Sequence, residues 1–210
     1  KDNDDIVEIT YDDILKYHGR QMIGGAALAF KIMLMTFPKL SDEIPQRGNF
    51  SFYSGIGQNG RGIIDATEMV MRVKTNNQLR LELEYSDDKL GQIAPGGGRY
   101  YFEIGYNDKM VKLYLKEGII PDEFIKYSKL SHKCKAENVE MKKEDLEKLI
   151  EIGQKLFGYA GNFNWIDTSS ITDMSALFFR NYTFNGHIEL WDVSNVTNMH
   201  GMFYNAKKFN

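Results

Sequence analysis

The sequence predicts an α+β protein in which helices pack on a mainly antiparallel sheet, followed by a linker helix and a short repeat solenoid. Apolar and polar residues alternate through residues 79–85 and again through residues 100–115, as in half-buried strands. Helical spacing of apolar residues dominates residues 26–37 and 142–157. Beyond Phe163 one pattern recurs every 25 residues. A period between about 20 and 50 residues is typical of solenoids.

The composition allows a sizeable core and excludes several classes of protein. Of the 210 residues 42% are hydrophobic, and the formal net charge is −3. No basic stretch is present, so a nucleic-acid site is not predicted. The most apolar run, residues 22–37, contains Lys31 and is shorter than the roughly 20 residues that span a bilayer, so no transmembrane segment is predicted. The single cysteine, Cys134, excludes a disulfide within the chain.

Residues 6–130 are expected to form the α+β domain. Thr10 and Asp13 fit a capping box at the start of a short helix. A long apolar helix follows, and Pro38 is expected to end it because the residue before proline avoids helical angles. Pro121 is expected to open a further helix.

The rest of the chain is expected to hold two further parts. Residues 131–160 are interpreted as a polar, lysine-rich linker up to Met141 and an amphipathic helix after it. Residues 161–210 carry about two copies of the 25-residue pattern, whose apolar side chains are expected to stack in columns, copy on copy. The expected columns are Ile171/Val196, Met174/Met199, Leu177/Met202, Phe178/Phe203 and Phe184/Phe209.

Residues 191–210 resemble the BspA-like leucine-rich surface repeat of bacteria, whose pattern is W-D-V-S-x-V-T-N-M-x-x-M-F-x-x-A-x-x-F-N. The earlier copy departs from the pattern, because four residues are missing after Asn164 and Ile166 takes the place of tryptophan. The resemblance implies a leucine-rich-type solenoid, a surface or secreted location, and a protein or host-surface partner. A cytoplasmic location is the alternative. The chain begins at Lys1 rather than at methionine, which is compatible with a removed export signal or a trimmed chain.

Residues 13–25 (DILKYHGRQMIGG) resemble a motif of the E-type chain of formylmethanofuran dehydrogenase, in which a helix ends in F-H-G-H-x-C-P-G and a long apolar helix follows. Residues 62–68 (GIIDATE) resemble the helix start C-x-V-D-A-I-Q of the same family, and residues 98–102 (GRYYF) resemble its strand G-K-x-A-F-x-F. The resemblance covers roughly residues 10–125 and implies an α+β fold.

The same resemblance implies a metal site, such as one for zinc, held by the histidines and cysteines of these motifs. His18 is retained. The other ligand positions carry residues that do not bind zinc, namely Arg20, Met22, Ile23 and Gly62. Zinc needs three or four ligands, so His18 requires Asp65 and Glu68 beside it to hold a metal. The first hypothesis is therefore a degenerate domain in a non-catalytic binding or surface-interaction protein.

A second hypothesis is an enzyme or a small-ligand or metal-binding protein. Its pocket is formed by His18, the glycine-rich loop of residues 55–62 and Arg99, which is suited to clamp a carboxylate or phosphate. The candidate ligand-binding residues are His18, Gly57, Gly60, Asp65 and Arg99. No nucleophile–histidine arrangement points to catalytic residues, and a homo-oligomer is compatible with the sequence.

A third hypothesis is a dinucleotide-binding protein. Residues 55–60 fit G-x-G-x-x-G between a predicted strand and a predicted helix. Glu82, Glu84 and Asp87 follow at the distance expected for a ribose contact. This hypothesis requires a parallel sheet with the glycine loop at the carboxyl edge of a strand. The structural alternative is a loop that needs glycine backbone angles.

Overall fold

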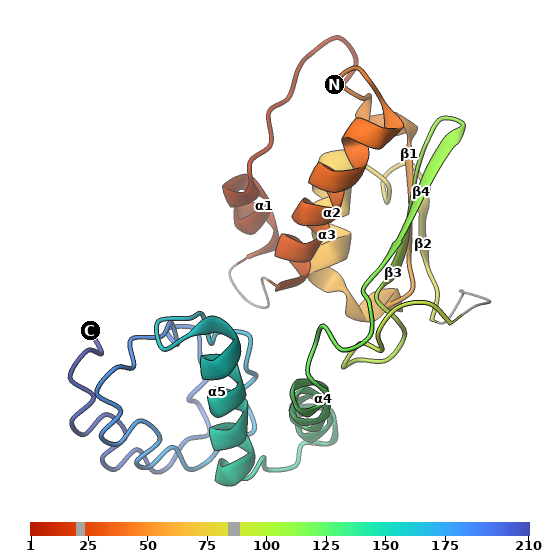
Figure 1. Ribbon diagram of the computed structural model, residues 1–210. Helices are drawn as coiled ribbons and strands as arrows, with labels where there is room; N and C mark the ends of the chain where they lie inside the picture. Colours follow the sequence, from red (N-terminus) through yellow and green to blue (C-terminus); the bar gives the residue numbers. More distant parts are fainter. Residues whose placement is uncertain (20–23, 84–88) are drawn as a thin grey trace. The chain divides into compact units, whose positions relative to one another are not determined.

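The computed structural model describes residues 1–19, 24–83 and 89–210. Contacts divide the chain into two compact units, Lys1–Ile120 and Pro121–Asn210. Both units are drawn in Figure 1, and each is considered by itself. Among the described residues, no helix combines the length and the apolar character needed to cross a membrane.

Within the described part of the first unit, four strands form one sheet in the order β2-β1-β3-β4. The strands are β1 (Phe50–Ser54), β2 (Leu79–Leu81), β3 (Tyr101–Tyr106) and β4 (Lys109–Tyr114). β1 pairs in parallel with β2 and antiparallel with β3, and β3 pairs antiparallel with β4. The α+β class is confirmed, but the sheet is mixed. A helix carries the chain back from the end of β1 to the start of β2, which is the crossover that parallel pairing needs.

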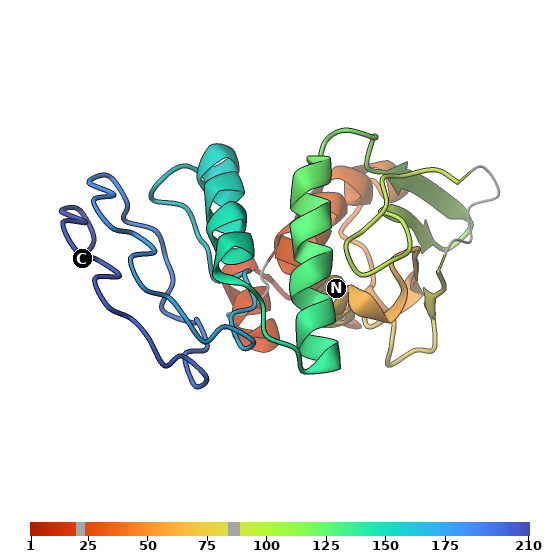
Figure 2. The same ribbon diagram turned by 90° about the horizontal axis from the view of Figure 1, so that it is seen from below.

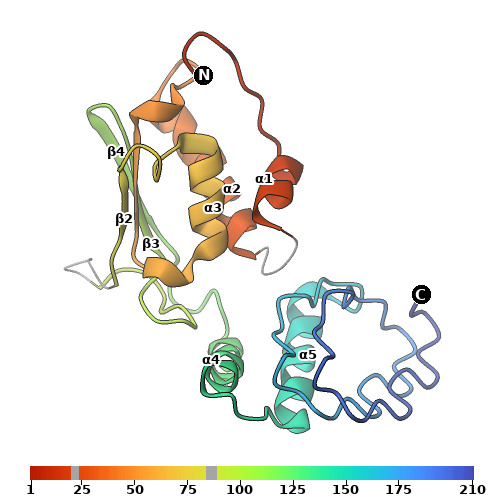
Figure 3. The same ribbon diagram turned by 180° about the vertical axis from the view of Figure 1, so that it is seen from behind.

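Three helices lie on the same side of this sheet. They are α1 (Tyr11–His18), α2 (Gly24–Leu40) and α3 (Arg61–Met71). Figures 1 and 3 show α2 and α3 against the sheet and α1 on the far side of these two helices. The first turns of α2 and α3 touch backbone to backbone, because a Cβ atom on Gly62 would lie 2.8 Å from the nitrogen of Ala26. Glycine is therefore required at position 62 by helix packing.

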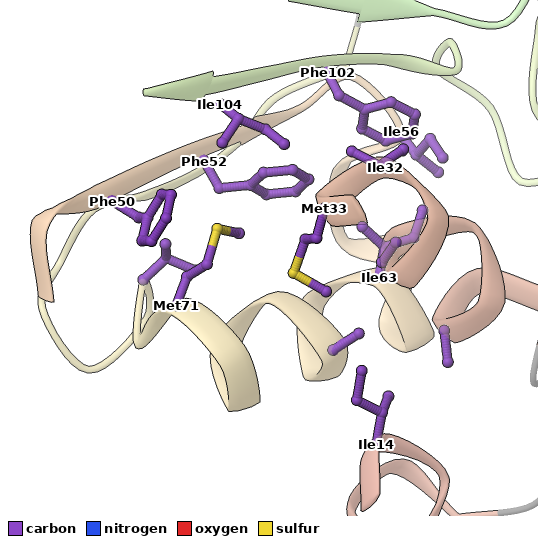
Figure 4. Packing of buried hydrophobic residues seen from close by; sticks show 14 of the residues in the cluster. Ile14, Ile32, Met33, Phe50, Phe52, Ile56, Ile63, Met71, Phe102 and Ile104 are labelled. Atoms are coloured by element: carbon purple, nitrogen blue, oxygen red, sulfur yellow. The ribbon is translucent and has the colours of Figure 1, made fainter. Parts of the chain in front are cut away.

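The core of this unit lies between the helices and the sheet (Figure 4). Alternate residues of β1 and β3 point to it, and the rings of Phe52 and Phe102 stack there at 6.0 Å. Ile32 and Met33 of α2 and Ile63 of α3 pack from the helical side. This alternation is the one that the sequence predicts for half-buried strands.

Pro38 does not end α2, which continues to Leu40. Proline removes only one N–H group from the helix. The remaining bonds of the last turn are made, since the Ser41 nitrogen donates to the Phe37 oxygen at 3.0 Å. Leu40 is buried in the core and anchors this turn.

The second unit contains α4 (Asp122–Glu137), α5 (Lys143–Phe157) and the repeat segment. The sequence predicts a polar linker from residue 131 onward, but residues 131–137 are helical. The buried side chains of Ser131 and Cys134 give this part of α4 an inner face despite its lysines. Figure 2 shows the repeat segment as two passes of chain beside α5.

The two copies of the repeated pattern are joined by a backbone ladder. N–H groups of the first copy donate to carbonyls of the second at 2.7 to 2.9 Å: Met174 to Asn198, Ala176 to His200, Phe178 to Met202 and Arg180 to Tyr204. The spacing in sequence between donor and acceptor is the same at all four steps, so each side chain lies beside its counterpart in the other copy. Ala176 and Arg180 have positive φ, and so do their counterparts Gly201 and Asn205.

The aromatic columns form as predicted. Phe178 stacks on Phe203 at 5.4 Å, and Phe184 stacks on Phe209 at 5.6 Å. Met174 and Met199 do not share an environment, because Met174 is fully buried whereas Met199 is 45% exposed. The second copy covers the first, and no further copy within the 210 residues covers the second. Burial therefore differs although the sequence pattern is the same.

Candidate functional site

The carboxyl end of α1 carries the first candidate residue, His18. Thr10 caps the helix, since its hydroxyl accepts from the Asp13 nitrogen and Asp13 accepts from the Thr10 nitrogen, as the sequence predicts. The helix ends at Gly19, whose φ of 90° is unfavourable for other residues. Its N–H donates to Leu15. Both ends of this short helix are thus fixed, and they set the position of His18.

His18 meets Asp65 of α3 across 47 residues of sequence. Its Nδ1 lies 2.7 Å from Oδ2 of Asp65. The side chain of His18 is only 4% exposed and that of Asp65 is 25% exposed. Arg61, one turn earlier on α3, approaches the same oxygen at 3.6 Å but is 83% exposed. An exposed pair of this length contributes little, so the histidine is the main partner of Asp65.

The carboxylate of Asp65 fixes the tautomer of the neutral His18 ring. An ionised carboxylate only accepts hydrogen bonds, so Nδ1 carries the proton and Nε2 keeps a lone pair. Nε2 is buried, and no polar atom of the described residues lies within hydrogen-bonding distance of it. A histidine oriented by a carboxylate in this way is suited to bind a metal ion or to accept a proton from a ligand.

Glu68, the other acidic candidate of this helix, faces elsewhere. Its carboxylate accepts from the nitrogens of Lys74 and Thr75 and from the Thr75 hydroxyl. Burial would raise the pKa of Glu68, but these hydrogen bonds and the charge of Arg72 lower the pKa below its ordinary value of 4.5. Glu68 therefore holds the turn after α3, and the fold brings only Asp65 to His18.

The described residues contain no group of three His, Cys, Asp or Glu side chains placed to hold a metal ion. His18 and Asp65 together supply one nitrogen and one carboxylate. Zinc needs one or two ligands more. The pair by itself does not fit a structural zinc centre.

The glycine loop that contains Gly57 and Gly60 packs against a second loop. Gly55 exchanges backbone hydrogen bonds with Arg99 and Tyr101, both at 2.9 Å. Gly57 is buried with a φ of +65°, and a Cβ atom there would lie 2.9 Å from Leu83. Gly60 has ordinary angles and open contacts of 3.6 Å or more. These glycines serve close loop packing, which is the structural alternative.

The surroundings of this loop match part of the dinucleotide hypothesis. β1, α3 and β2 form a strand–helix–strand unit with a parallel pair, and the loop follows the carboxyl end of β1. However, the backbone of residues 25–26 packs on the first turn of α3 at Gly62, where a phosphate would approach. Two of the expected ribose contacts, Glu84 and Asp87, lie outside the described residues.

Arg99 is occupied by contacts within its own loop region. Its Nη1 donates to the Gly91 carbonyl at 2.7 Å and lies 3.5 Å from Glu117. The side chain is 16% exposed. The contacts of Arg99 and those of His18 thus involve different residues, and the structure gives no direct link between these two members of the predicted pocket.

Two cavities of the first unit were not predicted from the sequence. One, of about 310 Å³, is apolar and lies between the amino-terminal segment and α2, with Val7, Phe30 and Leu34 in its wall. The other, of about 380 Å³, is polar and includes Asp2 and Arg47. Neither is lined by His18, Gly57, Gly60 or Arg99. The apolar residues Ile6, Val7 and Ile9 next to a charged terminus were the available signal.

Comparison with known proteins gives one match. The family model described as "Mycoplasma protein of unknown function, DUF285" matches residues 126–210. This segment begins within α4 and includes α5 and both copies of the repeat. No curated protein and no solved structure matches the chain.

Proposed function

We propose that the chain is a non-catalytic binding protein that acts in surface interactions through its repeat unit. In this proposal the second unit is the start of a BspA-like, leucine-rich-type solenoid. The observation that carries it is the ladder between the two copies, which buries Phe178 and leaves Phe179 and Tyr204 exposed at matching positions. Aromatic residues held rigidly at a surface are typical of binding sites.

The first unit is, on this proposal, a degenerate relative of the E-type chain of formylmethanofuran dehydrogenase. The resemblance assigns His18 to the first metal ligand and non-ligating residues to the others. Asp65 contacts His18, so the retained histidine has a structural partner of its own. A buried histidine that is hydrogen-bonded to a carboxylate stabilises the contact between α1 and α3 without any metal.

Binding of the labelled full chain to cultured epithelial cells, measured by flow cytometry, tests this function. Saturable binding is expected, with loss in Phe178→Ala, which breaks the aromatic stack of the repeats. His18→Ala, in the other unit, is the matched control and is expected to bind like the wild type. The proposal fails if binding never saturates, or if it depends on His18 and not on Phe178.

A second candidate function, ligand or metal binding at His18, rests on the buried lone pair of Nε2. Protein purified without metal and then incubated with zinc distinguishes it from the first. One zinc per chain by elemental analysis, lost in both His18→Ala and Asp65→Ala, favours this second candidate. It would contradict a degenerate first unit.

A further inference from the structure

An aromatic and basic surface runs along the outer side of the two repeats. Phe179 and Tyr204, at equivalent positions of the two copies, stack at 5.2 Å with planes 14° apart. The guanidinium of Arg180 lies 5.2 Å from the Phe179 ring centre, and Lys207 lies 5.5 Å from that of Tyr182. We call these five residues the aromatic–basic ridge. Its three rings are 46%, 49% and 56% exposed.

The ridge carries positive charge without nearby compensation in the sequence. Residues 174–188 and 193–210 contain no aspartate or glutamate, whereas they contain Arg180, Lys207 and Lys208. The acidic residues between these segments are engaged locally. Asp192 accepts from the Ser194 nitrogen at 2.9 Å, and Glu189 lies 3.4 Å from His187. In a chain of net charge −3, this end of the repeats is thus a basic exception.

The edge of the second copy adds a row of backbone donors. The first copy donates from Met174, Ala176, Phe178 and Arg180 to the second copy. The equivalent groups of the second copy are the N–H groups of Met199, Gly201, Phe203 and Asn205. No hydrogen bond of the described residues is donated by these four N–H groups. The carbonyls of Met199, Gly201 and Phe203 already accept within turns of their own copy. The edge therefore offers donors, and a second copy presenting the same edge would supply no acceptors.

We infer that the aromatic–basic ridge, with this donor edge, binds an acidic peptide segment of a partner protein; the inference rests on the proposed surface-interaction function. The donor edge needs acceptors, and the first copy already satisfies its equivalent groups with peptide carbonyls. The cations select carboxylates, and the exposed rings supply the apolar contact typical of binding hot spots.

Other ligands fit these groups less well. A neutral polysaccharide leaves Arg180, Lys207 and Lys208 without counter-charges. A nucleic acid requires several neutralised phosphates, and binding strength follows that number. Three cations on an otherwise acidic chain provide few such contacts. An anionic glycan and an oligonucleotide are therefore competing ligands in the test.

Binding of the full chain to a random copolymer of glutamate and tyrosine, followed by biolayer interferometry at about 0.15 M salt, tests the inference. Heparin, an oligothymidylate and polylysine are compared with it. The copolymer is expected to bind most tightly and to be weakened by added salt. Tyr204→Ala and the double variant Arg180→Glu/Lys207→Glu are each expected to weaken binding about tenfold, the loss of a single hot spot.

Lys129→Glu, a charge reversal on the exposed side of α4, is the matched control and should bind like the wild type. Circular dichroism and tryptophan fluorescence verify folding, and Tyr204→Ala carries the test if the double variant does not fold. The inference is overturned if the copolymer does not bind, if heparin or the oligonucleotide binds more tightly, or if ridge variants bind normally. Saturable cell binding that survives both variants would overturn it while leaving the proposed function intact. Absence of cell binding by the wild type removes the function itself.

Discussion

Phe178 and Phe203 occupy equivalent positions of the two repeat copies and stack with their ring planes 9° apart. Phe178 also stacks on Phe184 at 3.8 Å, and Phe203 stacks on Phe209 at 4.2 Å. The four rings make a continuous block that joins the two copies. Phe178 and Phe184 are fully buried in it, so the block is the main apolar link of the repeat segment.

Phe178→Ala is expected to destabilise the second unit by about 3–5 kcal/mol, as large-to-small substitutions in a packed core do. Both tryptophans, Trp165 and Trp191, lie in this unit, so tryptophan fluorescence during urea unfolding follows it selectively. Phe179→Ala, at the neighbouring exposed position, is the control and is expected to cost less than about 1 kcal/mol. Equal losses in the two variants would contradict the buried block.

The period of the repeat predicts which side chains stack because a fixed period returns the same residue type to the same height. It does not predict burial, which depends on whether another layer covers the copy. Met174 and Met199 have equivalent places in the pattern, yet only Met174 is covered. Likewise, alternation in residues 79–83 is the same for parallel and antiparallel strands, so the direction of β2 had to come from the structure.

The candidate site was predictable in part. The motif around His18 and the helix start at Asp65 point to two of its residues, but their contact spans 47 positions and depends on how α1 packs on α3. Arg99 illustrates the opposite case. An arginine after three glycines is suited to a ligand clamp, and sequence cannot show that Gly91 and Glu117 already accept from it.

Asp65→Ala is expected to destabilise the first unit by about 1–3 kcal/mol, because it leaves the buried Nδ1 of His18 without an acceptor. Hydrogen–deuterium exchange of α1 and α3 amides measures this loss within the unit. Asp65→Asn keeps an acceptor oxygen and should restore part of it. Arg61→Ala removes only the exposed 3.6 Å contact and is expected to change stability by less than about 0.5 kcal/mol. A larger effect of Arg61 than of Asp65 would refute this assignment.

Gly62→Ala is expected to destabilise the contact of α2 with α3 by about 1–3 kcal/mol, the usual cost of overpacking. The new Cβ atom would lie 2.8 Å from the backbone nitrogen of Ala26, which no side-chain movement relieves. Exchange of α2 and α3 amides reports the change. Gly60→Ala is the control, because the contacts at position 60 are ordinary and its φ is negative. If Gly60→Ala is the more damaging substitution, packing does not explain these glycines.

Glu103 on β3 gives the first unit a predictable dependence on pH. Its carboxylate accepts from the Tyr101 hydroxyl at 2.6 Å and lies 3.1 Å from Lys112, and the side chain is 8% exposed. Burial would raise the pKa of Glu103. The hydrogen bonds from Tyr101 and Lys112, with the charges of Lys112 and Arg80, outweigh burial and lower the pKa below 4.5.

Because the folded-state pKa is the lower one, ionised Glu103 stabilises the fold above pH 4.5, and this contribution declines as the pH falls through the folded-state value. Glu103→Gln is therefore expected to be about 1–3 kcal/mol less stable than the wild type near neutral pH. The difference should shrink steadily as the pH falls below 4.5. Exchange of β3 and β4 amides along a pH series measures it. Glu82→Gln alters a carboxylate that is 52% exposed and 3.6 Å from Arg80, so its difference from the wild type should stay small at every pH. A Glu103→Gln difference that grows as the solution becomes more acidic would show that the carboxylate is held against its charge and not for it.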